Sequence, residues 1–152
     1  MSIRQPVDIW YDSAIPNLID SNVSGTIYTT ADFPKIFDYG DYILRMRIYD
    51  DAPATKDLSD VDTFSLEIGE LGGSVFISAN NASFNLVADW ASVQANVGNI
   101  CVSFDANVAS LVTDLGTSNY KTYYAEILGT NTTSGDTLTV ALYPIKIHST
   151  VG

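Results

Sequence analysis

Hydrophobic and polar residues alternate along most of the chain after residue 40. In residues 42–49 every second position is apolar, and Arg45 and Arg47 lie between the apolar positions. This period of two is typical of a strand with one buried face. The alternation returns in residues 63–68 after a polar loop. We therefore expect the two segments to form an antiparallel pair that places Glu67 near the two arginines.

The same alternation predicts further strands, with polar or glycine-containing turns between several of them. The expected ranges are 74–78, 82–87, 99–105, 120–128 and 137–142. In the last of these the pattern places Leu138, Val140 and Leu142 inward. Because Pro144 has no N–H to donate, we expect residues 145–147 to form an edge piece or a tail that faces a partner.

One segment has helical spacing instead. Its apolar residues occur at positions i, i+3, i+4 and i+7 between Val108 and Leu115. Asn107 stands where a helix N-cap would be, and Gly116 follows as a stop signal. The pattern predicts one short amphipathic helix.

These elements predict an all-β fold, an antiparallel two-sheet β-sandwich, Ig-like or jelly-roll-like, with one short α-helix. We expect residues 33–152 to form a single β-sandwich domain and residues 1–32 to form an extended N-terminal arm. The core is predicted from the shared inward parity of its members. They are Leu44, Met46, Ile48, Phe64, Leu66, Val102, Phe104, Ile127, Val140 and Leu142.

The arm carries apolar residues at an irregular spacing that prolines and asparagines interrupt. Such a segment cannot bury these side chains by itself. Two arrangements stay open: the arm covers a neighbouring subunit or partner protein, or it packs on its own sandwich as an edge strand. The candidate assembly residues are Val7, Ile9, Trp10, Tyr11, Leu18, Ile19, Ile27 and Tyr28.

Charge narrows the range of partners. The chain has 7 basic and 18 acidic residues and a net charge of −11, with no cluster of lysine or arginine. Nucleic acids and anionic membranes are therefore not expected as partners. The sequence shows neither a secretory signal nor an apolar run of the ~20 residues that a membrane span requires. We expect a protein that is made in the cytoplasm, is not secreted and does not insert into a membrane.

The residues that carry most enzyme chemistry are scarce. Cys101 lies in an alternating strand and His148 lies four residues before the end, so a nucleophile paired with a base is not expected. Zinc would need more histidines and cysteines. The acidic loop of residues 50–62 leaves calcium binding open. A glycosidase needs two carboxylates that face one cleft, and the glutamates of the chain are only Glu67, Glu70 and Glu126. We expect no catalytic residues, no cofactor and no enzymatic activity.

Aromatic side chains suggest a second kind of site. Trp90 and Tyr124 could form a platform on which a sugar ring stacks, as in carbohydrate-binding modules. The alternative is that these rings serve packing alone, because strands carry aromatic residues for that purpose too.

Several motifs resemble a known family. Gly40-Asp41 leads into the strand of residues 44–50, and Asp57-Leu58-Ser59-Asp60 follows it. A strand that ends near Phe104-Asp105, a short helix and the strands of residues 123–127 and 137–147 complete the pattern. Over residues 34–148 the chain resembles β-sandwich domains of tailed-phage virion structural proteins, notably the N-terminal domain of baseplate upper proteins and of tail-fibre-associated proteins.

The resemblance implies a bacteriophage virion structural protein, a tail, baseplate, fibre-attachment or head-decoration component that works through protein–protein assembly. It implies other virion proteins as partners, a homo-oligomer with a trimer favoured, and a location in the virion. It brings no catalytic residues. The alternative is a non-catalytic carbohydrate-binding module or host-receptor-binding domain that recognises a host surface glycan.

Overall fold

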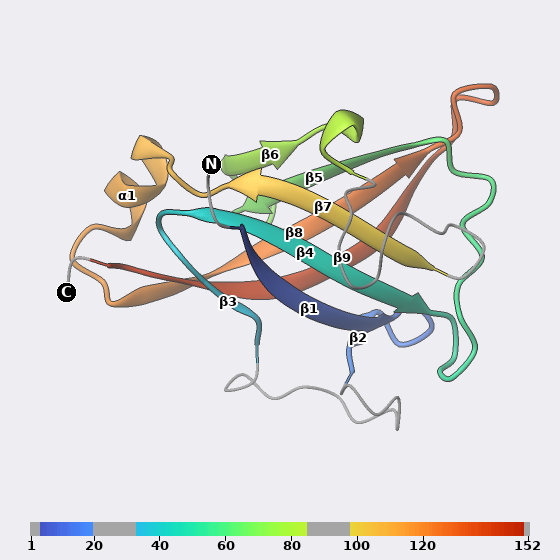
Figure 1. Cartoon of the computed structure of the whole chain (residues 1–152), viewed down its shortest axis with the longest axis horizontal. Coiled ribbons are helices and arrows are strands. Elements are labelled where there is room, and N and C mark those ends of the chain that lie inside the picture. Colours follow the sequence, from blue (N-terminus) through green and yellow to red (C-terminus); the bar gives the residue numbers. More distant parts are fainter. Residues whose placement is uncertain (1–3, 20–32, 85–97, 151–152) are drawn as a thin grey trace.

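The computed structural model describes residues 4–19, 33–84 and 98–150, which form two β-sheets packed face to face (Figure 1). One sheet has the strand order β2-β1-β4-β7. Its strands are β1 Arg4–Asp12, β2 Asn17–Leu18, β4 Asp41–Tyr49 and β7 Asn99–Asp105. The other sheet has the order β3-β9-β8-β5-β6. Its strands are β3 Lys35–Phe37, β5 Thr63–Gly69, β6 Val75–Ala79, β8 Tyr120–Thr130 and β9 Thr137–His148.

The predicted all-β sandwich with one short helix is confirmed. Both sheets are mixed, however, because β1 runs parallel to β4 and β3 runs parallel to β9. Parallel neighbours need a long connection between them. The chain between β1 and β4 supplies one, since β2 and β3 both lie within it.

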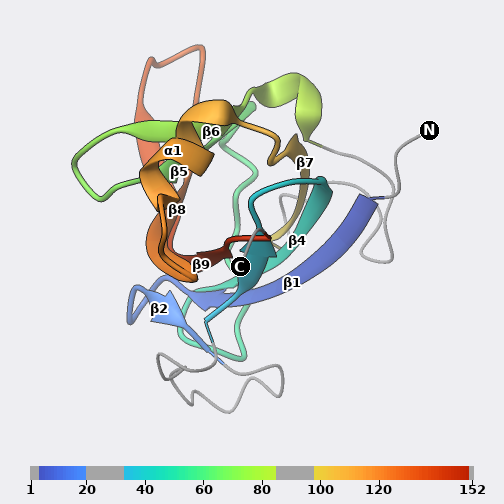
Figure 2. The same ribbon diagram turned by 90° about the vertical axis from the view of Figure 1, so that its left-hand side faces the viewer.

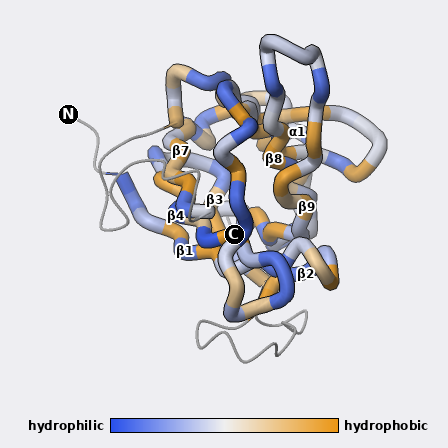
Figure 3. Tube along the Cα trace, turned by 90° about the vertical axis from the view of Figure 1, so that its right-hand side faces the viewer, coloured by the Kyte–Doolittle hydropathy of each residue, from blue (hydrophilic) through white to orange (hydrophobic). Residues whose placement is uncertain are grey.

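The core lies between the two sheets. Along each strand the inward positions are apolar and the outward positions are mostly polar. Figure 3 shows that strands of both sheets carry hydrophobic residues. Of the predicted core residues, only Leu142 is not buried. The core also contains Leu58 from the loop after β4, which is 1% exposed.

Helix α1, Ala109–Leu115, covers one end of the sandwich (Figure 2). It buries Leu111 and Leu115, as its spacing predicts, and Gly116 ends it with φ 58°. The N-cap residue is Val108 and not Asn107.

The predicted pairing of β4 with β5 is wrong. The two strands belong to different sheets, and β4 lies between β1 and β7. Both strands bury an apolar face in the same core, and alternation alone cannot distinguish neighbours in one sheet from strands on opposite sides of a core. Glu67 is therefore not the partner of Arg45, which instead forms a bidentate ion pair with Asp8 of β1. Arg47 donates from Nε to Asn99 Oδ1 at 3.1 Å.

The end of the chain also departs from the prediction. Pairing between β8 and β9 shifts after Ile127, and Val140 and Ala141 are consecutive buried residues. From Ala141 onward this bulge exchanges the inward and outward positions of β9, so Leu142 is only half-buried. Leu138 precedes the bulge, near the hairpin end of β9, and is 42% exposed.

Strand β9 runs straight through Pro144 to His148. A proline is tolerated there because β3 pairs with β9 only from Lys146 onward, so among the described residues no strand flanks Pro144 on that side.

The segment predicted as a strand at residues 82–87 is only partly described. Asn81–Ser83 forms a 3-10 turn and Phe84 makes an isolated bridge to Val102. The rest of the predicted strand, residues 85–87, lies outside the described residues. Trp90, the other residue of the candidate sugar platform, lies outside them too.

Candidate interaction surface

The outer face of the five-stranded sheet carries a hollow of about 310 Å³. Strands β5, β8 and β9 form its floor, and the turn between β5 and β6 forms its rim. Tyr124 and Glu126 enter the hollow from β8, Glu67 from β5 and Leu142 from β9. Its size is at the lower end of the range for ligand sites in proteins.

Two carboxylates meet in this hollow. Glu67 and Glu126 are direct partners in the antiparallel register of β5 and β8. Side chains at such positions have Cβ atoms about 4.5–5.5 Å apart, and like charges placed there repel each other. We call Glu67 and Glu126 the acidic pair.

A second like-charge pair lies on the same face. Lys35 of β3 and Lys146 of β9 are direct partners in the parallel register of these strands. Lys146 is 9% exposed, and its Nζ lies 5.2 Å from the centre of the Tyr120 ring. We call Lys35 and Lys146 the basic pair.

Aromatic side chains surround the basic pair. The His148 ring stacks on Tyr120, with centroids 5.2 Å apart, and lies 6.1 Å from the ring of Phe37. Phe37 and Tyr120 are each 48% exposed. His148 is thus part of a strand and an aromatic row, and not a free tail as expected.

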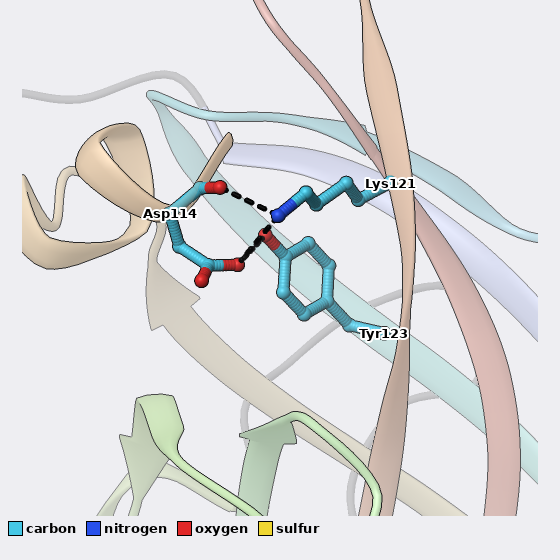
Figure 4. A network of polar contacts seen from close by, with 3 residues as sticks. All are labelled: Asp114, Lys121 and Tyr123. Atoms are coloured by element: carbon cyan, nitrogen blue, oxygen red, sulfur yellow. Dashed lines mark hydrogen bonds and ion pairs between the residues drawn. The ribbon is translucent and has the colours of Figure 1, made fainter. Parts of the chain in front are cut away.

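A polar network fastens α1 to β8 (Figure 4). Tyr123 Oη donates a hydrogen bond to Asp114 Oδ2 at 2.6 Å, and Lys121 Nζ donates to the Asp114 carbonyl oxygen at 2.7 Å. The bond from Tyr123 is the largest influence that lowers the pKa of Asp114. Burial, and then the hydrogen bond to Asp114, raise the pKa of the Tyr123 phenol. The ammonium group of Lys121 at the end of α1 also suits the helix dipole.

Half of the eight candidate assembly residues of the predicted arm are buried in the sandwich. Strand β1 is paired with β4 along its whole length, so the first described part of the arm packs on its own chain. Four of the candidates are buried and therefore have no surface left for a partner in this conformation: Ile9, Tyr11, Leu18 and Ile19. Val7 and Trp10 are half-buried, and Ile27 and Tyr28 lie outside the described residues. Whether this segment contacts another subunit stays a prediction.

The acidic loop after β4 is largely bound to the protein itself. Asp57 accepts from the Ser59 N–H, and Asp62 accepts from the N–H and hydroxyl of Thr132. These hydrogen bonds lower the pKa of both carboxyls. In the part of the chain that the structure describes, no three acidic, histidine or cysteine side chains converge as metal ligands.

The remaining candidate for chemistry is Cys101. Its thiol is fully buried, and burial raises its pKa. A thiol of this kind is inert as a nucleophile. Within residues 4–19, 33–84 and 98–150 there is also no helix with the length and apolar content that crossing a bilayer would take.

Comparison with solved structures shows a likeness in fold. The chain is similar in structure to the N-terminal domain of phage TP901-1 ORF48, with a TM-score of 0.49 and 10% sequence identity. The match covers 95% of this chain and 98% of that domain. No family model matches the sequence, and no curated protein matches it.

Proposed function

We propose that this chain is a structural component of a tailed-phage virion, in the tail, baseplate, fibre attachment or head decoration. It is made in the host cytoplasm, becomes part of the particle, and works through contacts with other virion proteins and with further copies of itself. The resemblance in sequence favours three copies.

The observation that carries this proposal is the role of the motif residues in the fold. Gly40 makes the turn into β4 with φ 100°, and its N–H donates to Asn107 Oδ1. Leu58 is buried in the core, and the Asp60 carbonyl accepts from Asn131 Nδ2 at 2.8 Å. The residues that resemble phage domains therefore hold a loop against the β8–β9 hairpin. They build a rigid scaffold, which is what an assembly protein requires.

The test is to look for the chain in purified particles of the phage that encodes it. Mass spectrometry should find it in stoichiometric amount, and gold-labelled antibodies should bind the tail or another defined part of the particle. A chain that is abundant in the lysate and absent from purified particles would contradict the virion role.

Catalysis is not part of the proposed function. The acidic pair is a place where a glycosidase activity can be sought, since two neighbouring carboxylates are the usual catalytic groups of such enzymes. The purified chain is expected not to hydrolyse host polysaccharide. Hydrolysis that disappears in Glu67→Gln or Glu126→Gln would overturn this expectation.

A second candidate function, glycan binding, is favoured by the position of Tyr124. Its ring lies in the hollow beside two carboxylates and the apolar side chain of Leu142. A sugar can place its C–H face on such a ring and donate hydroxyl hydrogen bonds to the carboxylates.

If the hollow binds glycan, Tyr124→Ala is expected to weaken binding by roughly tenfold, because it removes the stacking surface. A glycan array with the full chain gives the measurement. Tyr39→Ala is the control, since Tyr39 is 56% exposed and does not line the hollow. An array without any signal would exclude glycan binding as a function of the hollow. It would not affect the proposed virion role.

A further inference from the structure

The outer face of the five-stranded sheet carries two like-charge pairs of opposite sign. The acidic pair spans β5 and β8, and the basic pair spans β3 and β9. Among the described residues, neither pair takes part in an ion pair. Each pair is unfavourable by itself, because identical charges lie directly opposite each other. A partner that brings a positive charge to the acidic pair and a negative charge to the basic pair would reduce the repulsion within each pair.

The register of β8 and β9 fixes how the two pairs are spaced. Lys146 lies opposite Thr122, Pro144 lies opposite Tyr124, and Leu142 lies opposite Glu126. The rows that hold the two charged pairs are therefore about 13 Å apart along the strands. The row of Tyr124 and Pro144 lies midway between them.

We propose that two copies of this chain pack together through this face, about a two-fold axis that passes beside Tyr124 and Pro144. The axis places the basic pair of each copy against the acidic pair of the other. Such a contact is isologous, because the same patch is used on both sides and every contact occurs twice. The apolar side chains of the middle row meet at its centre.

Charge complementarity identifies the occupant as a second copy. A purely basic partner would be repelled by Lys35 and Lys146, and a purely acidic one would be repelled by Glu67 and Glu126. The occupant must carry positive and negative charges at the spacing that separates the acidic pair from the basic pair. The same face of a second copy carries charges of both signs at this spacing. The hollow beside the acidic pair leaves space for the lysine side chains of the other copy.

The inference does not depend on the virion role. A two-fold contact closes with two copies, whereas the trimer that the resemblance implies would use another surface.

Two variants of the full chain test the proposal. Glu67→Lys with Glu126→Lys makes the face wholly basic, and Lys35→Glu with Lys146→Glu makes it wholly acidic. Light scattering after size-exclusion chromatography should find the unchanged chain as a dimer. The dimer should weaken as salt is added, because screening reduces the attraction that involves the exposed Lys35 and Glu67. Each variant alone should be a monomer. An equimolar mixture of the two variants should recover the dimer, since a basic face then meets an acidic one.

The control is Asp50→Lys with Asp60→Lys. It changes the net charge by the same amount as the basic variant, at exposed loop positions outside the face, and should leave the dimer intact. Circular dichroism melting checks that each variant folds. If Lys146→Glu disturbs the packing of that nearly buried side chain, Lys35→Glu alone serves as the acidic partner. A monomeric unchanged chain, variants that stay dimeric, or a mixture of folded variants that does not associate would each overturn the proposal.

Discussion

Replacing Leu66 by aspartate is expected to unfold the protein at room temperature. Leu66 is fully buried on the inner face of β5, where its side chain belongs to the core shared by both sheets. A carboxylate placed there has no partner and loses its hydration, which costs several kcal/mol. A domain of this size has a total stability of only about 5–15 kcal/mol. The variant should therefore lose the cooperative thermal transition that the unchanged chain shows by circular dichroism.

The neighbouring position supplies the control for this experiment. Ser65 points to the outer face of the same strand and is half-exposed. Ser65→Asp should shift the melting temperature only slightly, because the new charge stays in water. If Leu66→Asp melts like Ser65→Asp, the assignment of β5 to the core is wrong.

The second large effect is expected at Asp12, at the end of β1. This side chain is 4% exposed, and its carboxylate accepts hydrogen bonds at 2.9 Å from the N–H groups of Ala14, Asp51 and Ala52. It therefore holds the loop after β4, including Asp51 with its unfavourable φ of 64°. Asp12→Ala removes the buried carboxylate that accepts from these three N–H groups and should cost about 3 kcal/mol of unfolding free energy. Urea denaturation measures the loss.

Asp57→Ala is the matched control for Asp12→Ala. Asp57 is exposed and accepts within its own loop from Ser59, so its removal should cost less than about 1 kcal/mol. Equal losses in the two variants would mean that the buried carboxylate does not anchor the loop.

The contribution of Asp12 should also depend on pH. Burial acts to raise the pKa of this carboxyl, but the hydrogen bonds from Ala52, Ala14 and Asp51 outweigh burial and lower it. A carboxyl whose folded pKa lies below its unfolded value of about 3.9 stabilises the fold fully above that pH. The stabilisation is lost as the pH falls through the folded pKa. The difference in stability between the unchanged chain and Asp12→Ala should thus narrow below about pH 4.

The alternation of apolar and polar residues predicted the buried face of most strands well. It predicted which strands are neighbours in a sheet poorly. The period of two along β4, β5 and β7 identified inward residues correctly, because it depends only on which side of a strand is apolar. It could not show which strands are neighbours, and β4 and β5 were wrongly paired. The inward position predicted for Leu142 in β9 was wrong for a related reason, since the bulge opposite Ile127 has no signature in the sequence.

The candidate surface was harder to predict than the fold. Tyr124 was identified as an outward aromatic residue, and it does line the hollow. The acidic and basic pairs were missed, because each joins residues from strands whose register no sequence pattern specifies. The signal that could have found them is the outward parity of Glu67 and Glu126 once β5 and β8 are known to be adjacent.

The place of β9 within its sheet has a consequence for how the protein is made. This last strand lies between β3 and β8, and nearby Asp38 accepts hydrogen bonds from Thr150, 112 positions further along the chain. During synthesis the ribosome therefore releases β3, β5 and β8 before the strand that joins β3 to β8 exists. Until then these strands expose unpaired edges and apolar faces, the state in which nascent chains aggregate or recruit chaperones. Completion of the five-stranded sheet is thus a late event that follows translation of residues 137–148.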